Sequence, residues 1–151
     1  MAKAWVVVAN GSRARVFEAD SPKGGFTREV ATLIHTQSRL LEQGLTTDLP
    51  GRTFDSVGQG RHSLEVRTRA KRHEKENFAA EIADVLDRAC AAGKFHHLIL
   101  AATPAFMGML RRRLGPHSSR RIVHTVEKDL TRYPPARIRS QLPDKLWMLY
   151  G

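Results

Sequence analysis

The fold shows first in residues 4–20, AWVVVANGSRARVFEAD. Two short apolar runs rich in β-branched residues flank Asn10-Gly11, and such runs favour strands. Asn-Gly between them is the strongest short hairpin signal, because both residues tolerate positive φ. A second turn is predicted at residues 21–25, and residues 26–35 predict a third strand. The chain therefore opens with three strands that pair in antiparallel order.

The second half of the sequence alternates between helical and strand patterns. Apolar residues recur there with the period of a helix, interrupted by short β-branched or aliphatic runs. Glycine and proline mark the ends of these segments, as they do at helix caps and first turns. The predicted elements are a helix from about Lys71 to Gly93, a strand over 96–102, a helix from Thr103 to near Gly115, a strand over 121–126 and a short helix from Pro134 to about Leu142.

The order of these elements, β-β-β-α-β-α-β-α, predicts a single α/β domain over residues 1–151. A meander followed by right-handed crossovers gives one mixed five-stranded sheet with helices packed over it. This is the order of an RNase H-like sheet. The apolar tail, residues 146–150, is expected to pack on the body of the domain or against a second subunit in a homo-oligomer.

Composition narrows the choice of partners. The chain has 25 Lys plus Arg against 15 Asp plus Glu and a formal net charge of +10. This excess favours anionic partners, which are nucleic acid, an acidic protein or an anionic membrane surface. No apolar stretch approaches the roughly 20 residues of a membrane helix, and no signal peptide is predicted. We therefore expect a cytoplasmic protein.

A long segment without a sustained period, about residues 36–70, is predicted to be a loop. It contains Gly58-Gln59-Gly60, and a cationic run to Lys75 follows. Glycines beside a glutamine let the backbone approach a ligand closely, and the amide can both donate and accept hydrogen bonds. Arginine and lysine nearby suit phosphate contacts.

Two interpretations of this segment stay open. The functional one is a loop that enters an RNA site, and the other is a flexible surface loop with a solvated charge run. The predicted nucleic-acid-binding residues are Gly58, Gln59, Gly60, Arg61, His62, Arg67, Arg69, Lys71, Arg72 and His73.

A second basic cluster contains Arg111, Arg112 and Arg113, followed by Arg120 and Arg121. Arginines at the end of a helix can stabilise the helix macrodipole, and a phosphate-binding rim is the alternative. The choice depends on whether this cluster shares a face with residues 61–75.

Metal and cofactor sites are not predicted. The seven histidines are scattered, and the single cysteine, Cys90, excludes both a thiolate cluster and an internal disulfide. Residues 4–10 contain no carboxylate, which argues against a two-metal nuclease. No Gly-rich lysine loop for nucleotide phosphates is present.

Several motifs together carry a family resemblance. They are the run from Trp5 through Asn10-Gly11 to Phe17, the motif Asp48-x-Pro50-Gly51-Arg52-x-Phe54-Asp55-Ser56, the motif His73-Glu74-x-Glu76-x-Phe78, and residues 128–131. Over nearly its whole length the chain resembles the bacterial family called "protein required for attachment to host cells". This resemblance implies a role in attachment, which a non-enzymatic protein-interaction module could serve indirectly.

That family is in turn similar to the middle domain of archaeal and eukaryotic peptide-chain release factors and of Pelota-like ribosome rescue factors. In release factors a Gly-Gly-Gln loop follows the third strand, and here Gly58-Gln59-Gly60 stands in the same place with the order changed. The resemblance implies RNA or ribosome association, and peptidyl-tRNA hydrolysis with Gln59 as catalytic residue is the alternative. Pelota-like relatives lack the motif and do not release peptide, so we expect a binding domain without a cofactor rather than an enzyme.

Overall fold

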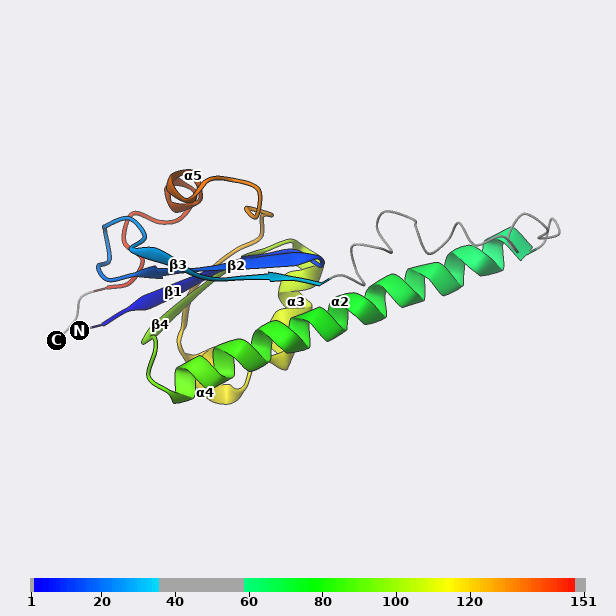
Figure 1. The fold of residues 1–151 in the computed structure, drawn as a ribbon, viewed down its shortest axis with the longest axis horizontal. Coiled ribbons are helices and arrows are strands. Elements are labelled where there is room, and N and C mark those ends of the chain that lie inside the picture. The colour runs from blue at the N-terminus through cyan, green and yellow to red at the C-terminus, as the bar shows by residue number, and fades with distance from the viewer. Residues whose placement is uncertain (1, 36–58, 149–151) are drawn as a thin grey trace.

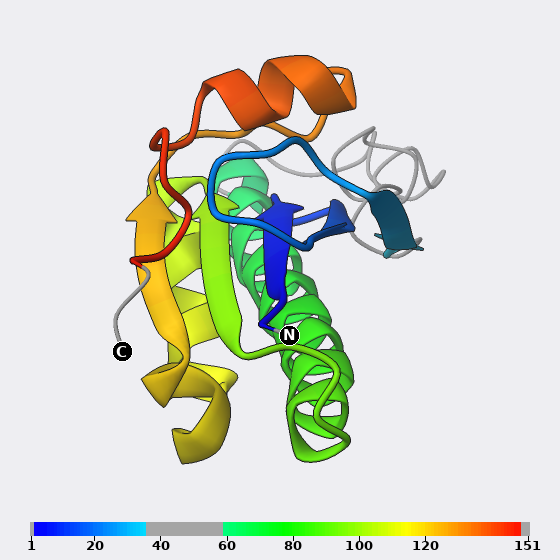
Figure 2. The same ribbon diagram turned by 90° about the vertical axis from the view of Figure 1, so that its left-hand side faces the viewer.

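The computed structural model describes residues 2–35 and 59–148, with the backbone alone for residues 59–63. One mixed five-stranded sheet has the strand order β3-β2-β1-β4-β5. Helices α2 and α3 cover one face and α5 covers the other (Figures 1 and 2). The predicted α/β class and mixed five-stranded sheet are confirmed. The described elements are β1 (Ala4–Ala9), β2 (Arg13–Ala19), β3 (Arg28–Ile34), α2 (Gln59–Ala91), β4 (His97–Ala102), α3 (Pro104–Arg113), α4 (Pro116–Arg120), β5 (Ile122–Val126) and α5 (Pro135–Ser140).

The β1–β2 hairpin is present as predicted, but its turn has a different physical basis. Neither Asn10 nor Gly11 has a positive φ. Instead, Asn10 Oδ1 accepts hydrogen bonds from the backbone N–H groups of Ser12 (2.8 Å) and Arg13 (2.9 Å), which is an Asx turn. Gly11 allows a close approach of Lys75, because a Cβ there would lie 2.7 Å from carbons of that flexible side chain and would require it to move.

The larger hydrophobic core lies between the sheet and helices α2 and α3. Alternate strand residues such as Trp5 and Val7 point into it. From α2 it receives Phe78, Ile82 and Leu86, which are spaced four apart and at most 1% exposed. Burial of each such side chain contributes about 1.5–3 kcal/mol, so this stretch fixes α2 to the sheet.

A smaller core covers the opposite face of the sheet. Ile138 of α5 and the tail residues Leu146 and Trp147 are buried there. Trp147 stacks on His97 with ring centroids 4.9 Å apart. Packing of the tail on the body of the domain is therefore confirmed for Leu146 and Trp147, while the homo-oligomer stays a prediction.

Two elements differ from the prediction. Helix α2 begins at Gln59 and not near Lys71, so residues 59–70, expected in the long loop, are helical. The sequence of residues 59–70 shows no helical period of apolar residues, because such a period comes from a buried apolar face, which this stretch lacks. The short helix α4 was not predicted. It follows Gly115, whose N–H donates to Asp87 Oδ1 at 3.1 Å.

Candidate nucleic-acid interface

The first half of α2 projects past the end of the sheet, as Figure 1 shows. We call residues 59–77 the outer half and residues 78–91 the inner half. Over residues 64–77, where side chains are described, none is buried. Helix α2 has 33 residues, and a rise of 1.5 Å per residue makes it about 50 Å long. None of the described side chains of the outer half is therefore buried, although Glu74 and Lys75 lie against the domain and are only partly exposed.

The predicted cations of the outer half do not form a single stripe. Successive helical residues are rotated by about 100°, so residues two apart lie on nearly opposite sides. Arg67 and Arg69 thus point away from each other, and so do Arg69 and Lys71. Lys71 lies within about 40° of Arg67, whereas Arg72 and His73 lie within about 60° of Arg69. The structure therefore places these cations in two groups on roughly opposite sides of the helix, not in a single stripe.

In the described part of the chain, most of these cations have no anionic partner. Within the described residues, Arg67, Arg69 and Lys71 make no side-chain hydrogen bond or ion pair. Arg72 approaches Glu76, with Nε 3.7 Å from Oε1, but the arginine side chain stays 72% exposed. Exposed pairs of this kind are worth about 0.3–0.5 kcal/mol on a helix. These positive groups are therefore accessible to an external anion.

A half-buried histidine holds the point at which α2 leaves the sheet. His35, which follows β3, stacks on Phe78 with ring centroids 5.2 Å apart. Its Nδ1 lies 3.3 Å from Glu81 Oε1, and its Nε2 lies 3.6 Å from Glu74 Oε1. The ring stacking holds α2 against the end of β3 at Phe78, whereas Nε2 of His35 makes no hydrogen bond to the described residues.

The remaining predicted site residues divide into two groups. Gln59, Gly60, Arg61 and His62 form the start of α2, so the expected probing loop is a helical turn from Gln59 onward. Their predicted RNA contacts, and the catalytic role of Gln59, stay predictions. Outside the described residues lie Gly58 and the motif residues Asp48, Pro50, Gly51, Arg52, Phe54, Asp55 and Ser56.

The second basic cluster lies at the opposite end of the inner half. Arg111, Arg112 and Arg113 end α3, just before α4. Asp87 of α2 joins α4 through a 2.6 Å hydrogen bond from Ser118 Oγ, whereas Lys75 lies beside the β1–β2 turn. The two clusters are therefore separate surfaces at the two ends of the domain, so the described residues do not form the shared face on which a single phosphate-binding rim depended.

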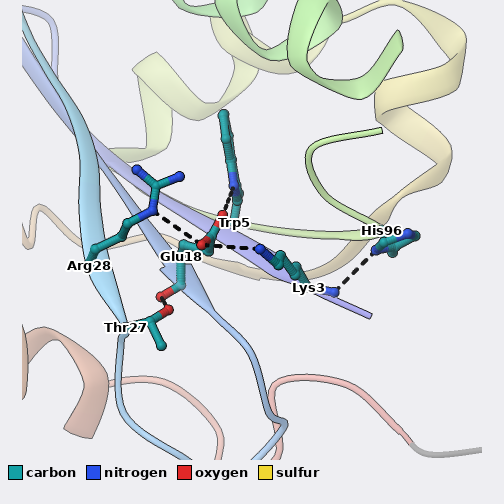
Figure 3. Close-up of polar contacts among 6 residues, drawn as sticks. All are labelled: Lys3, Trp5, Glu18, Thr27, Arg28 and His96. Atoms are coloured by element: carbon teal, nitrogen blue, oxygen red, sulfur yellow. Dashed lines mark hydrogen bonds and ion pairs between the residues drawn. The ribbon is translucent and has the colours of Figure 1, made fainter. Parts of the chain in front are cut away.

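A buried carboxylate that the sequence analysis missed ties three strands together (Figure 3). Glu18 is 6% exposed and accepts hydrogen bonds from Trp5 Nε1 (3.2 Å) and Arg28 Nε (3.3 Å), with Lys3 Nζ at 3.7 Å. Burial raises the pKa of Glu18, but these hydrogen bonds and charges outweigh it and leave the pKa below its ordinary value. An acid in phase with buried Val16 on β2 was the signal for this site.

Glu18 also anchors the neighbouring backbone. Its carbonyl accepts hydrogen bonds from the N–H (2.7 Å) and hydroxyl (2.8 Å) of Thr27. On the next strand, the Lys3 N–H donates to His96 Nδ1 at 3.1 Å (Figure 3). All of these partners belong to the domain itself, so the cluster is a structural latch at the end of the sheet away from the outer half.

Two segments of the family resemblance meet beside the β1–β2 turn. Asn10 Nδ2 donates to Asp129 Oδ2 at 2.9 Å, and Thr131 Oγ1 donates to Asp129 Oδ1 at 2.6 Å. Burial raises the pKa of Asp129, but the hydrogen bonds from Asn10 and Thr131 lower it by more than burial raises it. The pKa of Asp129 therefore lies below its ordinary value. The Asn10-Gly11 and 128–131 motifs therefore form one latch.

Metal and membrane sites receive no support from the described part of the chain. Residues 2–35 and 59–148 contain no group of three or more His, Cys, Asp or Glu side chains placed to hold a metal ion. Among the helices described there, none has the length and apolar character needed to cross a membrane.

The sheet order and its covering helices define an α/β domain of the release-factor type. The crystal structure of the archaeal translation termination factor aRF1 is similar, with a TM-score of 0.50 and 8% sequence identity, over 94% of this chain and 35% of that chain. This likeness shows the fold alone, and the chain spans about a third of that factor's length. The chain belongs to the family described as "Protein required for attachment to host cells", whose model matches residues 5–142. No curated protein matches the sequence.

Proposed function

We propose that this chain is an RNA- or ribosome-associated binding domain that acts in the cytoplasm, with the outer half of α2 as its RNA-contacting element. The observation that carries the proposal is a projecting helix whose described side chains are all unburied and whose cations point to two roughly opposite sides. Helices in proteins owe most of their stability to packing of an apolar face. The outer half has no such face, so its exposed surface is suited to a partner.

The arrangement of charges favours one kind of RNA site. Arg67 and Arg69 point in opposite directions, so both reach phosphates only where RNA walls the helix on two sides. A helix with its side chains is about 10–12 Å across, and the major groove of A-form RNA is too narrow for side chains to read. We therefore infer that loops, bulges or junctions of folded RNA, including those of a ribosome, are the target.

A protein partner is the second candidate. Leu64 and Val66 of the outer half are 57% and 45% exposed, and exposed apolar residues favour protein contacts. Such a partner would fit a non-enzymatic module that acts indirectly in attachment to host cells. Peptidyl-tRNA hydrolysis by Gln59 gains no such support, because only the backbone of Gln59 is described.

Filter binding to tRNA and to ribosomes across a salt series tests the RNA proposal. The variant Arg67→Gln/Arg69→Gln/Lys71→Gln removes three charges from the outer half. Each lost phosphate contact should lower the slope of log affinity against log salt by about 0.7–0.9, so the variant should lose about two in slope. A matched control, Lys23→Gln/Arg137→Gln/Lys145→Gln, removes three charges elsewhere and should bind as the unmodified protein does.

Two results would overturn the proposal. One is absence of binding by the unmodified protein at low salt. The other is an equal loss in the outer-half variant and in the control, which would reduce the effect to net charge alone.

A further inference from the structure

Five arginines gather at the end of the domain that lies away from the outer half. Arg111, Arg112 and Arg113 form the last turn of α3, and Arg120 and Arg121 end α4 and lead into β5. All five are exposed, and within the described residues their side chains make no hydrogen bond or ion pair. We call these five residues the arginine end.

The acids close to the arginine end already have partners. Asp87 accepts hydrogen bonds from Gly115 N–H (3.1 Å) and Ser118 Oγ (2.6 Å). Asp84 pairs with Arg88 at 3.1 Å. The five guanidinium groups therefore have no ion-pair partner among the described carboxylates.

The helix macrodipole does not account for the whole cluster. Cations in the last turn of a helix contribute about 0.3–1 kcal/mol each, and the effect fades within that turn. This explains Arg111, Arg112 and Arg113 on α3. Arg120 ends, and Arg121 follows, a helix of only five residues, where the dipole is small. The arginine end therefore carries more unpaired arginines than the helix dipoles explain. Such a surface is suited to binding an external anion.

The residues of this surface favour phosphate over an acidic protein. Guanidinium groups bind phosphate oxygens with two parallel hydrogen bonds. Protein interfaces are built around a buried apolar or aromatic centre, and among residues 111–121 none is an exposed large hydrophobic. A pocket of about 350 Å³ lies beside the cluster, but its lining combines Arg121 with Asp87 and Cys90, so the exposed arginines and not this pocket support a phosphate contact.

We propose that the arginine end is a second RNA contact, so that the domain bridges two segments of RNA backbone. This inference rests on the proposed function and adds a second site to it. Along α2, Arg69 and Asp87 are 18 residues apart, which is about 27 Å. The two contacts therefore engage separate groups of phosphates, and their effects on binding should add.

The test is tRNA filter binding by Arg112→Gln/Arg113→Gln/Arg120→Gln, compared with the outer-half variant, with both combined, and with the Lys23→Gln/Arg137→Gln/Lys145→Gln control. Thermal unfolding checks that each variant folds. Loss of three contacts should lower the salt slope by about two, and the combined variant by about four. The charge-preserving Arg112→Lys/Arg113→Lys/Arg120→Lys should keep most of the slope but bind less tightly, because lysine lacks the two-pronged geometry.

Failure of this inference is separable from failure of the proposed function. If the arginine-end variant binds like the control while the outer-half variant binds weakly, the second contact is overturned and the proposed function stands. The reverse pattern overturns the outer half and supports the arginine end. Polyglutamate is the comparison probe. An equal loss of polyglutamate and tRNA binding in the arginine-end variant would overturn RNA as the partner and indicate an acidic protein.

Discussion

The two halves of α2 belong to one continuous helix but differ in what their side chains contact. The inner half buries Phe78, Ile82 and Leu86 against the sheet. The outer half buries no described side chain and carries its named cations in two groups on roughly opposite sides. Packing therefore explains why the inner half exists, and stability does not explain the outer half. A feature that stability does not require is a candidate for function.

The largest expected contrast between the halves is in the cost of truncation. Phe78→Ala should lower the free energy of unfolding by about 3–5 kcal/mol, because it leaves a cavity at a fully buried position. Leu64→Ala, at a residue 57% exposed, should change it by at most about 0.5 kcal/mol. Urea denaturation measures both. A loss at Leu64 comparable to that at Phe78 would show that the outer half packs on something.

A smaller difference is expected in how stability responds to acid, between a variant at buried Glu18 of the sheet and a variant in the outer half of α2. Because burial of Glu18 is outweighed by its hydrogen bonds and nearby cations, its pKa in the folded state lies below the ordinary carboxyl value, and the stabilisation it provides is present above that ordinary value. It is lost as pH falls through the folded-state pKa. Urea denaturation at successively lower pH should show a decline in stability below about pH 4.5 that Glu18→Gln reduces. Arg69→Gln in the outer half should leave this decline unchanged, and a decline of equal size in Glu18→Gln would exclude Glu18 as its source.

The smallest changes in stability should come from removing the exposed ion pairs. The outer and inner halves of α2 should then lose similar amounts. Arg72–Glu76 lies on the outer half and Arg88–Asp84 on the inner half, both spaced four apart. Glu76→Gln and Asp84→Asn should each cost about 0.2–0.5 kcal/mol, with a smaller cost at high salt. Thermal unfolding at two salt concentrations measures this. A cost above about 1 kcal/mol at either site would mean that the pair is not simply solvated.

The same contrast explains what could be predicted from the sequence. The inner half and the strands bury one face, so residues such as Phe78, Ile82 and Val7 carry the period that reveals helix or strand. The outer half has no buried face, and the sequence therefore suggested a loop up to residue 70.

Side-chain contacts between distant segments could not be predicted from the sequence. Asn10-Gly11 identified the hairpin, but the Asx turn and the contact of Gly11 with Lys75 depend on the folded chain. The sequence does not reveal the hydrogen-bond partners of Glu18, because Trp5 and Arg28 come beside it only when the strands pair. The separation of the two basic clusters likewise follows from the path of α3 back along β4, which no local pattern contains.

Amide hydrogen exchange along α2, with and without tRNA, tests the central claim most directly. In the free protein, amides of the outer half should exchange much faster than those of the inner half, because they open without disrupting the core. Addition of tRNA should slow exchange in residues 64–77 and leave residues 78–91 nearly unchanged. Exchange in the outer half that tRNA does not alter would contradict the claim that this projecting basic helix contacts RNA.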